Sequence, residues 1–178
     1  MPKKQTAFKG LSETLRREDF EALRMARELR EILTHLSFEG KLSLGKNLNR
    51  ARGVLRFFKQ RLNRHLDEEE KVVFPFLKTH IPKLEPLIAI LHSEHEDFRK
   101  NLGRFQFWLR ELVKEKNGFD RRRAIEKLKE TGIYLVYLLE GHAQEESEVL
   151  YKVADRQLRQ SEKRKLLKKM NRRNGASH

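Results

Sequence analysis

The sequence of 178 residues contains no cysteine and little glycine or proline, nine and four residues respectively. Without a thiolate, disulfide frameworks, cysteine-ligated zinc or iron–sulfur sites and catalytic thiols are excluded. A metal site in this chain must therefore consist of histidine and carboxylate side chains. Because glycine and proline interrupt regular structure, their scarcity predicts few, long secondary-structure elements.

Long apolar runs are missing as well. No stretch approaches the roughly 18 consecutive apolar residues of a membrane-spanning helix. The N-terminus, MPKKQTAFKG, lacks the apolar core of a signal peptide. We therefore expect a soluble, cytoplasmic protein, and its length suits one compact domain.

Acidic residues are too few to balance the basic ones, since 26 Asp and Glu against 40 Lys and Arg leave a formal net charge of +14. Nine of the basic residues, with a single Glu, lie between Arg156 and Asn174. Such a basic tail attracts nucleic acid, anionic membranes or acidic proteins through long-range fields. No recognisable nucleic-acid-binding motif accompanies it, so the class of partner stays open.

Apolar residues recur every three to four positions in four long segments, which is the spacing of one helix face. No segment alternates apolar and polar residues as a strand does. Short loops place consecutive helices side by side, so the sequence predicts an all-α, antiparallel up-and-down four-helix bundle with a short basic C-terminal helix. The expected helices span 12–38, 44–77, a segment from Pro86 to near Asn117, 120–153, and a shorter fifth from Ser161 to Met170.

This pattern also suggests three parts of the chain. They are a basic N-terminal extension (1–11), the bundle (12–155), and a basic C-terminal helix and tail (156–178). Within the bundle, the apolar faces are expected to continue through Val72 and Phe76 in the second helix, and through Val149 and Val153 in the fourth.

Two glutamates interrupt these apolar faces. Glu69 and Glu146 each follow a histidine by four residues, His65 and His142 respectively. On a helix, side chains four residues apart point the same way, so each pair offers imidazole nitrogen and carboxylate oxygen to one point. Each pair is therefore half of a metal site.

Two further histidines, His35 and His95, lie at core-facing or boundary positions of the first and third helices. Buried polar groups are costly unless they are paired or bind a metal, so the set predicts a metal site. A bundle with hydrogen-bonded histidines and no metal is the alternative. Ligands must also share one height, and His35 would match His65 only if the first half of the second helix were partly loop.

At these residues the sequence resembles the hemerythrin-like HHE cation-binding domains. The resemblance spans about Asp19 to Met170 and rests on HLDEEEKVVFPFL (65–77), LHSEHEDFRKNL (91–102) and GHAQEESEVLY (141–151). In that family a four-helix bundle holds two non-haem irons, bridged by two carboxylates and an oxo or hydroxo group. The resemblance implies that one iron is bound by His35 and His65, the other by His95 and His142, and that Glu69 and Glu146 bridge them.

The chain departs from the oxygen-carrying hemerythrins, which place two histidines four residues apart on the third helix and use aspartate as the last bridge. Here the corresponding residues are Leu91, Arg99 and Glu146. The pattern H, HxxxE, H, HxxxE is more similar to a bacterial branch linked to nitric oxide or peroxide chemistry, iron-centre repair and sensing. His92 is a candidate seventh ligand, or a hydrogen-bond partner of one.

The resemblance therefore implies a di-iron protein that binds or reacts with O2, NO or H2O2 in a stress response or in sensing. Manganese or zinc are alternatives to iron, because sites made of histidine and carboxylate accept several divalent metals. The residues also leave a second function open. The protein would then be a metal-stabilised binding module whose basic tail engages nucleic acid, an anionic membrane or an acidic protein.

Overall fold

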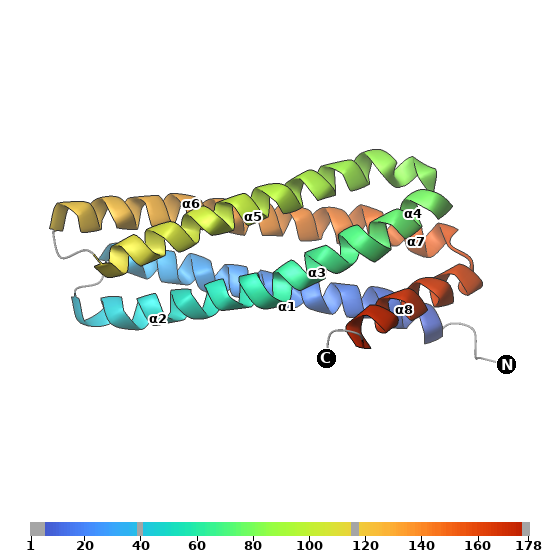
Figure 1. The fold of residues 1–178 in the computed structure, drawn as a ribbon, viewed down its shortest axis with the longest axis horizontal. Coiled ribbons are helices and arrows are strands. Elements are labelled where there is room, and N and C mark those ends of the chain that lie inside the picture. The colour runs from blue at the N-terminus through green and yellow to red at the C-terminus, as the bar shows by residue number, and fades with distance from the viewer. Residues whose placement is uncertain (1–5, 39–40, 115–117, 176–178) are drawn as a thin grey trace.

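The computed structural model describes residues 6–38, 41–114 and 118–175 (Figure 1). Over these residues the protein is all-helical and has no strand, which confirms the all-α part of the prediction. The expected helix end near Asn117, and residues 1–5 and 176–178 of the expected terminal segments, lie outside the described residues.

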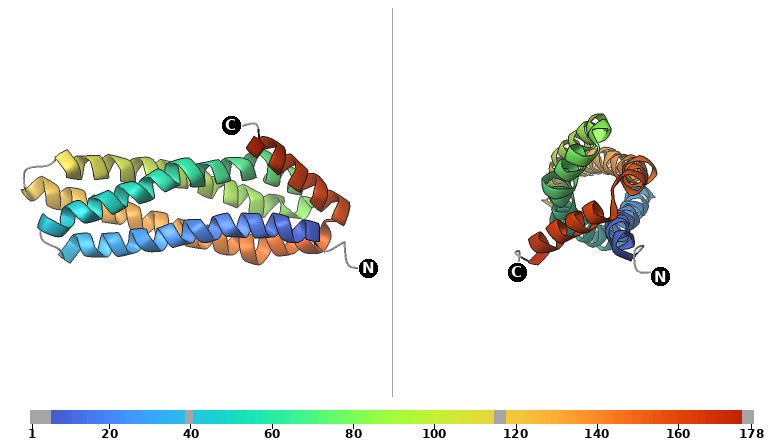
Figure 2. Two further views of the ribbon diagram at one scale, coloured as in Figure 1. Left: turned by 90° about the horizontal axis from the view of Figure 1, so that it is seen from below. Right: turned by 90° about the vertical axis from the view of Figure 1, so that its right-hand side faces the viewer.

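The described helices form four long rods and a shorter fifth one (Figures 1 and 2). The long rods lie side by side, and the fifth helix crosses one end of them. The first rod is α1 (Thr6–Phe38), and the third is α5 (Glu85–Lys114), which follows the short 3-10 turn η3 (Pro82–Leu84). The second rod combines α2 (Lys41–Phe57), η1 (Phe58–Leu62), α3 (Asn63–Glu68), η2 (Glu69–Val73) and α4 (Phe74–His80). The fourth combines α6 (Gly118–Glu145), η4 (Glu146–Leu150) and α7 (Tyr151–Gln157), and the fifth is α8 (Gln160–Gly175).

The segments η1, η2 and η4 are π-helical turns, in which the backbone bonds span five residues. The N–H of Phe74 donates to the carbonyl of Glu69, and that of Tyr151 donates to the carbonyl of Glu146. The turn η2 precedes Pro75, whose ring would otherwise press on the carbonyl four residues earlier. Single π-turns inside α-helices are rare and are often found at functional sites. Here two of them begin at the glutamates that the sequence singled out.

Each π-turn holds one residue more than an α-turn, and the buried face therefore moves by one position. In the fourth rod Val149 is 43% exposed, while the next residue, Leu150, is fully buried. In the second rod Val73 is buried, whereas Val72 only packs against the core from its edge. The predicted core position of Val149 is therefore wrong, and Val72 lies at the edge of the core, because a uniform helical period cannot account for the extra residue.

Buried apolar side chains form two clusters. On the second rod one cluster ends at Leu66 and the other begins at Val73, and on the third rod they are separated between Leu91 and Phe98. His65, Glu69 and His95 therefore lie in a polar layer between two apolar regions. The larger cluster includes Leu29, Ile32, Phe58, Phe98, Phe105 and Leu135, and the smaller includes Phe74, Phe76, Leu91, Leu150, Leu166 and Met170.

The helix α8 packs on α1 and on the second rod, and its Leu166 and Met170, which are 1% and 3% exposed, belong to the smaller apolar cluster. Its first turn is held by Lys163, whose ammonium donates to the carbonyl and carboxylate of Asp155 at 2.8 and 2.9 Å. No helix within the described ranges is long and apolar enough to cross a membrane.

Candidate metal centre

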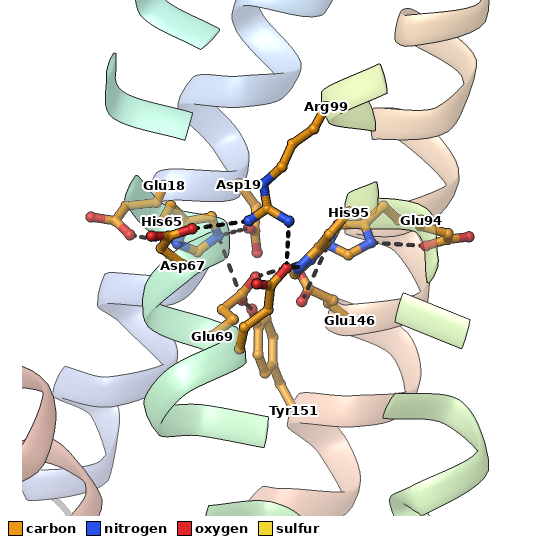
Figure 3. Close-up of polar contacts among 12 residues, drawn as sticks. Glu18, Asp19, His65, Asp67, Glu69, Glu94, His95, Arg99, Glu146 and Tyr151 are labelled. Atoms are coloured by element: carbon orange, nitrogen blue, oxygen red, sulfur yellow. Dashed lines mark hydrogen bonds and ion pairs between the residues drawn. The ribbon is translucent and has the colours of Figure 1, made fainter. Parts of the chain in front are cut away.

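The polar layer brings six ionisable side chains together from all four long rods (Figure 3). All six are buried, and Glu69 and Glu146 have no exposed surface. They form two groups, and within each group one ligand atom per residue lies within 4.8 Å of the others. The first group is Glu69, His95 and His142, and the second is Asp19, His65 and Glu146.

The Nε2 atoms of the three histidines point into this layer. His95 Nε2 lies 3.2 Å from His142 Nε2, and His65 Nε2 lies 3.1 Å from the Oδ1 atom of Asp19. Two donor atoms that bind one ion at about 2.1 Å are themselves about 3 to 3.5 Å apart. The observed spacing is therefore that of ligands around a shared ion.

Glu69 links the two groups. Its Oε1 atom is 3.5 Å from His65 Nε2, and its Oε2 atom is 3.6 Å from His95 Nε2. Glu146 links the two groups in the same way. It belongs to the group of Asp19 and His65, and its Oε1 atom is 3.4 Å from Nε2 of His142, which belongs to the other group. Both glutamates therefore lie where a carboxylate can bridge two ions.

A carboxylate also faces the outer nitrogen, Nδ1, of each histidine. His142 Nδ1 donates to Glu94 at 2.8 Å, and His65 Nδ1 lies 2.7 Å from Glu18. Such a contact fixes the orientation and the tautomer of the ring, and leaves Nε2 for a metal.

For His95 this outer carboxylate is Glu70, which accepts a hydrogen bond from Nδ1 at 2.8 Å. Glu70 is itself held by Arg99 at 2.7 Å, and Arg99 also donates to Asp67 at 3.0 Å (Figure 3). Burial would raise the pKa of Glu70, but the hydrogen bonds from Arg99 and His95 outweigh it and lower that pKa. Arg99 thus favours the charged form of Glu70, the carboxylate that supports His95.

Tyr151 closes the layer on the side of η4. Its side chain is 3% exposed, and its hydroxyl donates to Glu69 Oε1 at 3.2 Å (Figure 3). Burial and the charges of Glu146 and Glu69 raise the pKa of Tyr151 well above its usual value. The phenol therefore remains protonated and can serve as a hydrogen-bond donor to the bridging carboxylate.

The carboxylates lack partners for several oxygens. Glu69 Oε2, Asp19 Oδ2 and both oxygens of Glu146 are buried and accept no hydrogen bond from the described residues. Buried oxygens of this kind are costly unless a cation meets them. Burial and the charge of Glu146 raise the pKa of Glu69 well above its usual value. Burial also opposes ionisation of Glu146, but the charges of His142 and His65 outweigh it and lower its pKa to about 2.

The three histidines differ in their protonation. Burial opposes the charged forms of His65 and His142, but the neighbouring charges of Glu69 and Glu146 outweigh it and raise both pKa values well above 6.5. Burial and the charge of His142 lower the pKa of His95 to about 4. The metal-free centre therefore favours the charged forms of His65 and His142 and the neutral form of His95.

Metal binding is therefore expected to release protons. His65 and His142 must lose theirs before Nε2 can bind a cation, so the affinity should rise with pH from neutral up to their raised pKa values. Calorimetric titration with Fe²⁺ or Mn²⁺ in buffers of different ionisation enthalpy measures the release, and we expect a net release of protons on binding. Binding with no proton exchange would contradict the assignment of these two histidines as ligands.

Five of the seven residues predicted from the sequence lie in this layer, and two do not. The side chain of His35 is 45% exposed, and its Nε2 lies 3.8 Å from Glu31. The side chain of His92 is 50% exposed, and its Nδ1 lies 3.8 Å from Glu96. The structure thus places His35 and His92 on the surface. The five residues in the layer are His65, Glu69, His95, His142 and Glu146.

Helix register explains the misplacement of His35. The helix α2 begins at Lys41 with no loop in its first half, so His65 lies 24 residues into the second rod. His35 lies only three residues before the end of α1 at Phe38. Asp19 is sixteen residues further back, about 24 Å along the helix, and therefore reaches the level of His65.

The sequence does contain a signal for Asp19. Asp19 precedes Ala22 by three residues and Ala26 by seven, so it lies on the same buried face of α1. It is thus a charged residue on an apolar face, which is the criterion that identified Glu69. Glu18 and Glu94 have no comparable signal. They lie beside the buried faces of α1 and α5 respectively, and in the sequence they resemble ordinary surface residues.

Two histidines outside the layer provide a control. Replacing His80 or His92 by alanine is expected to leave both metal content and absorption spectrum unchanged. His80 lies at the end of α4, where its ring stacks on Phe76 and its Nδ1 donates to the carbonyl of Phe76 at 2.8 Å. Loss of metal from either variant, measured by elemental analysis, would place a ligand outside the polar layer.

Comparison with known proteins agrees with the composition of this centre. A family model described as the hemerythrin HHE cation-binding domain matches residues 10–122. The matched segment contains Asp19, His65, Glu69 and His95, while His142 and Glu146 lie beyond its end. No curated protein matches the chain. Since the matched segment is more than half of the sequence, the chain belongs to the hemerythrin HHE cation-binding domain family.

Proposed function

We propose that this protein is a non-haem di-iron protein that binds or reacts with a small ligand, O2, NO or H2O2. The observation that carries the proposal is the pair of buried donor groups, linked by Glu69 and containing carboxylate oxygens that accept no hydrogen bond from the described part of the chain. The four long rods would be the antiparallel up-and-down bundle of the family, with α8 as its short basic C-terminal helix. Their side-by-side packing supports this interpretation (Figure 2).

The donor set fits iron. Three imidazoles and three carboxylates offer nitrogen and oxygen only, a combination that suits Fe²⁺, Fe³⁺ and Mn²⁺ and leaves zinc as an alternative. With both glutamates shared, each ion would have four protein residues, which leaves part of its coordination shell to an exogenous ligand. In the bound state the two irons would supply the change between ferrous and ferric states that a small oxidising ligand requires.

The surrounding side chains fit such a reaction. Phe74 stacks on His95 with ring centroids 5.5 Å apart, and Leu66, Leu91 and Phe98 are at most 2% exposed. These apolar walls exclude bulk water and restrict access to small molecules. Tyr151 retains its proton beside Glu69 and is the hydrogen-bond donor nearest to the bridging position.

A role in the response to oxidative or nitrosative stress, or in sensing, follows from the nature of these ligands. A second function, recognition of an anionic partner through α8, is favoured by a separate observation. Arg164, Lys165, Lys168, Lys169 and Arg172 are exposed on that helix, and none forms an ion pair with a described carboxylate.

The test is the response of the iron-loaded protein to each small ligand. Ferrous protein is prepared without oxygen and mixed with O2, NO or H2O2 while its near-ultraviolet and visible absorption is recorded. We expect at least one ligand to change the spectrum in proportion to the bound iron, and no change in a variant that has lost its metal. Iron that is bound but does not respond to any of the three ligands would overturn the proposal and leave a structural metal.

A further inference from the structure

A second concave site lies on the outside of the protein, between α4 and α8. It has a volume of about 490 Å³, which lies within the range of small-molecule sites. Its wall on the α8 side carries Lys165, Lys169 and Arg172, and its opposite wall includes Pro75, Phe76 and His80. We call it the α4–α8 pocket.

The charge of the α4–α8 pocket is not compensated. No carboxylate is among the residues that line it, and no ion pair joins Lys165, Lys169 or Arg172 to a carboxylate of the described residues. A fourth lining cation, Lys71, is paired with Asp67 at 2.8 Å. Three like charges on one wall repel each other, and an anion in the pocket would remove that cost.

The pocket is held in place by the packing of both walls. Leu166 and Met170 are buried against the second rod, so the neighbouring positions of α8 must face α4. Opposite them, His80 and Phe76 stack with ring centroids 3.9 Å apart, and Lys169 Nζ lies 5.8 Å from the centroid of Phe76. The packing of α8 therefore holds the backbone that carries the three cations beside α4.

The spacing of the three cations identifies the class of anion. Positions 165, 169 and 172 follow one face of α8 over about 10 Å. A single phosphate group is too short to meet all three, whereas a chain of linked phosphates can do so. Lysine and arginine are the usual ligands of such groups, and arginine can bind two oxygens at once.

We propose that the α4–α8 pocket binds a polyphosphate group, either as free inorganic polyphosphate or as the phosphate chain of a nucleotide. The pocket is short, since it is lined only by residues of η2, α4 and α8, and this favours a small ligand over a nucleic-acid strand, which would need an extended groove. This site lies outside the polar layer and uses none of its residues, so the inference stands independently of the metal centre.

The test is calorimetric titration of the full chain with inorganic tripolyphosphate at constant ionic strength. The pocket variant is Lys165→Ala with Lys169→Ala. The matched control is Arg164→Ala with Lys168→Ala, because these residues are exposed on the same helix and do not line the pocket. We expect the pocket variant to lose at least about tenfold in affinity, since two charge-assisted contacts are removed, and the control to change less than about threefold.

Further titrations distinguish the sources of phosphate. Displacement of tripolyphosphate by ATP would indicate a nucleotide, while retention would indicate the free anion, and either supports the pocket. Equal loss of affinity in both variants would overturn it, because the attraction would then be the general charge of α8. Tighter binding of a single-stranded oligonucleotide, lost equally in both variants, would also overturn it in favour of a nucleic-acid surface. Unchanged helicity and metal content in each variant show that the fold is intact.

Discussion

Replacing Glu69 and Glu146 together by glutamine is expected to reduce the metal content from about two ions per chain to fewer than one. Each side chain reaches both donor groups, so the double change removes the links between the groups as well as two of the three negative charges. The amide keeps the size of the side chain, which makes the loss attributable to charge. Elemental analysis after loading with excess Fe²⁺ measures the effect.

A control removes two carboxylates from the surface. Glu126 and Glu148 are exposed on the fourth rod, and their change to glutamine should leave the metal content at the parent value. Retention of two ions in the Glu69 and Glu146 variant would show that neither glutamate is a bridge.

Replacing Asp19 by asparagine is expected to remove about one of the two ions, whereas His35→Ala should keep both. Asp19 lies 3.1 Å from His65 Nε2 and belongs to the group of His65 and Glu146, while the side chain of His35 faces solvent. Titration with Fe²⁺ or Mn²⁺ should therefore show one lost binding step in the first variant and none in the second. The opposite result would restore His35 as the ligand from the first helix and contradict the register of α1.

The parts of this protein that could be predicted from the sequence are those with a short-range signature. A period of three to four residues predicts helices, and a histidine followed after four residues by glutamate places both side chains on one face. These rules located His65, Glu69, His142 and Glu146, and the single histidine on the face of α5, His95. His95 and His142 lie at similar numbers of residues from the loop near Asn117, which predicts that they are neighbours. The structure confirms this with 3.2 Å between their Nε2 atoms.

The features that could not be predicted from the sequence depend on how separate rods are aligned and which residues they bring into contact. The choice between His35 and Asp19 is set by the length of helix between the first loop and His65, which only the structure shows to be unbroken. The π-turns at Glu69 and Glu146 shift the buried face by one residue, a shift that no fixed period contains. Arg99 is recognisable as a departure from the oxygen carriers, but its contact with Glu70 requires α5 to lie beside η2.

The number of iron ions per chain tests the central claim most directly. The tag-free protein is loaded with Fe²⁺ in the absence of oxygen, freed of unbound metal and measured for iron and protein concentration, with circular dichroism on the same sample. The structure predicts two irons for each folded chain, one for each donor group. A fully helical, stable chain that holds no iron would contradict the claim, and the six side chains would then be a hydrogen-bonded core network.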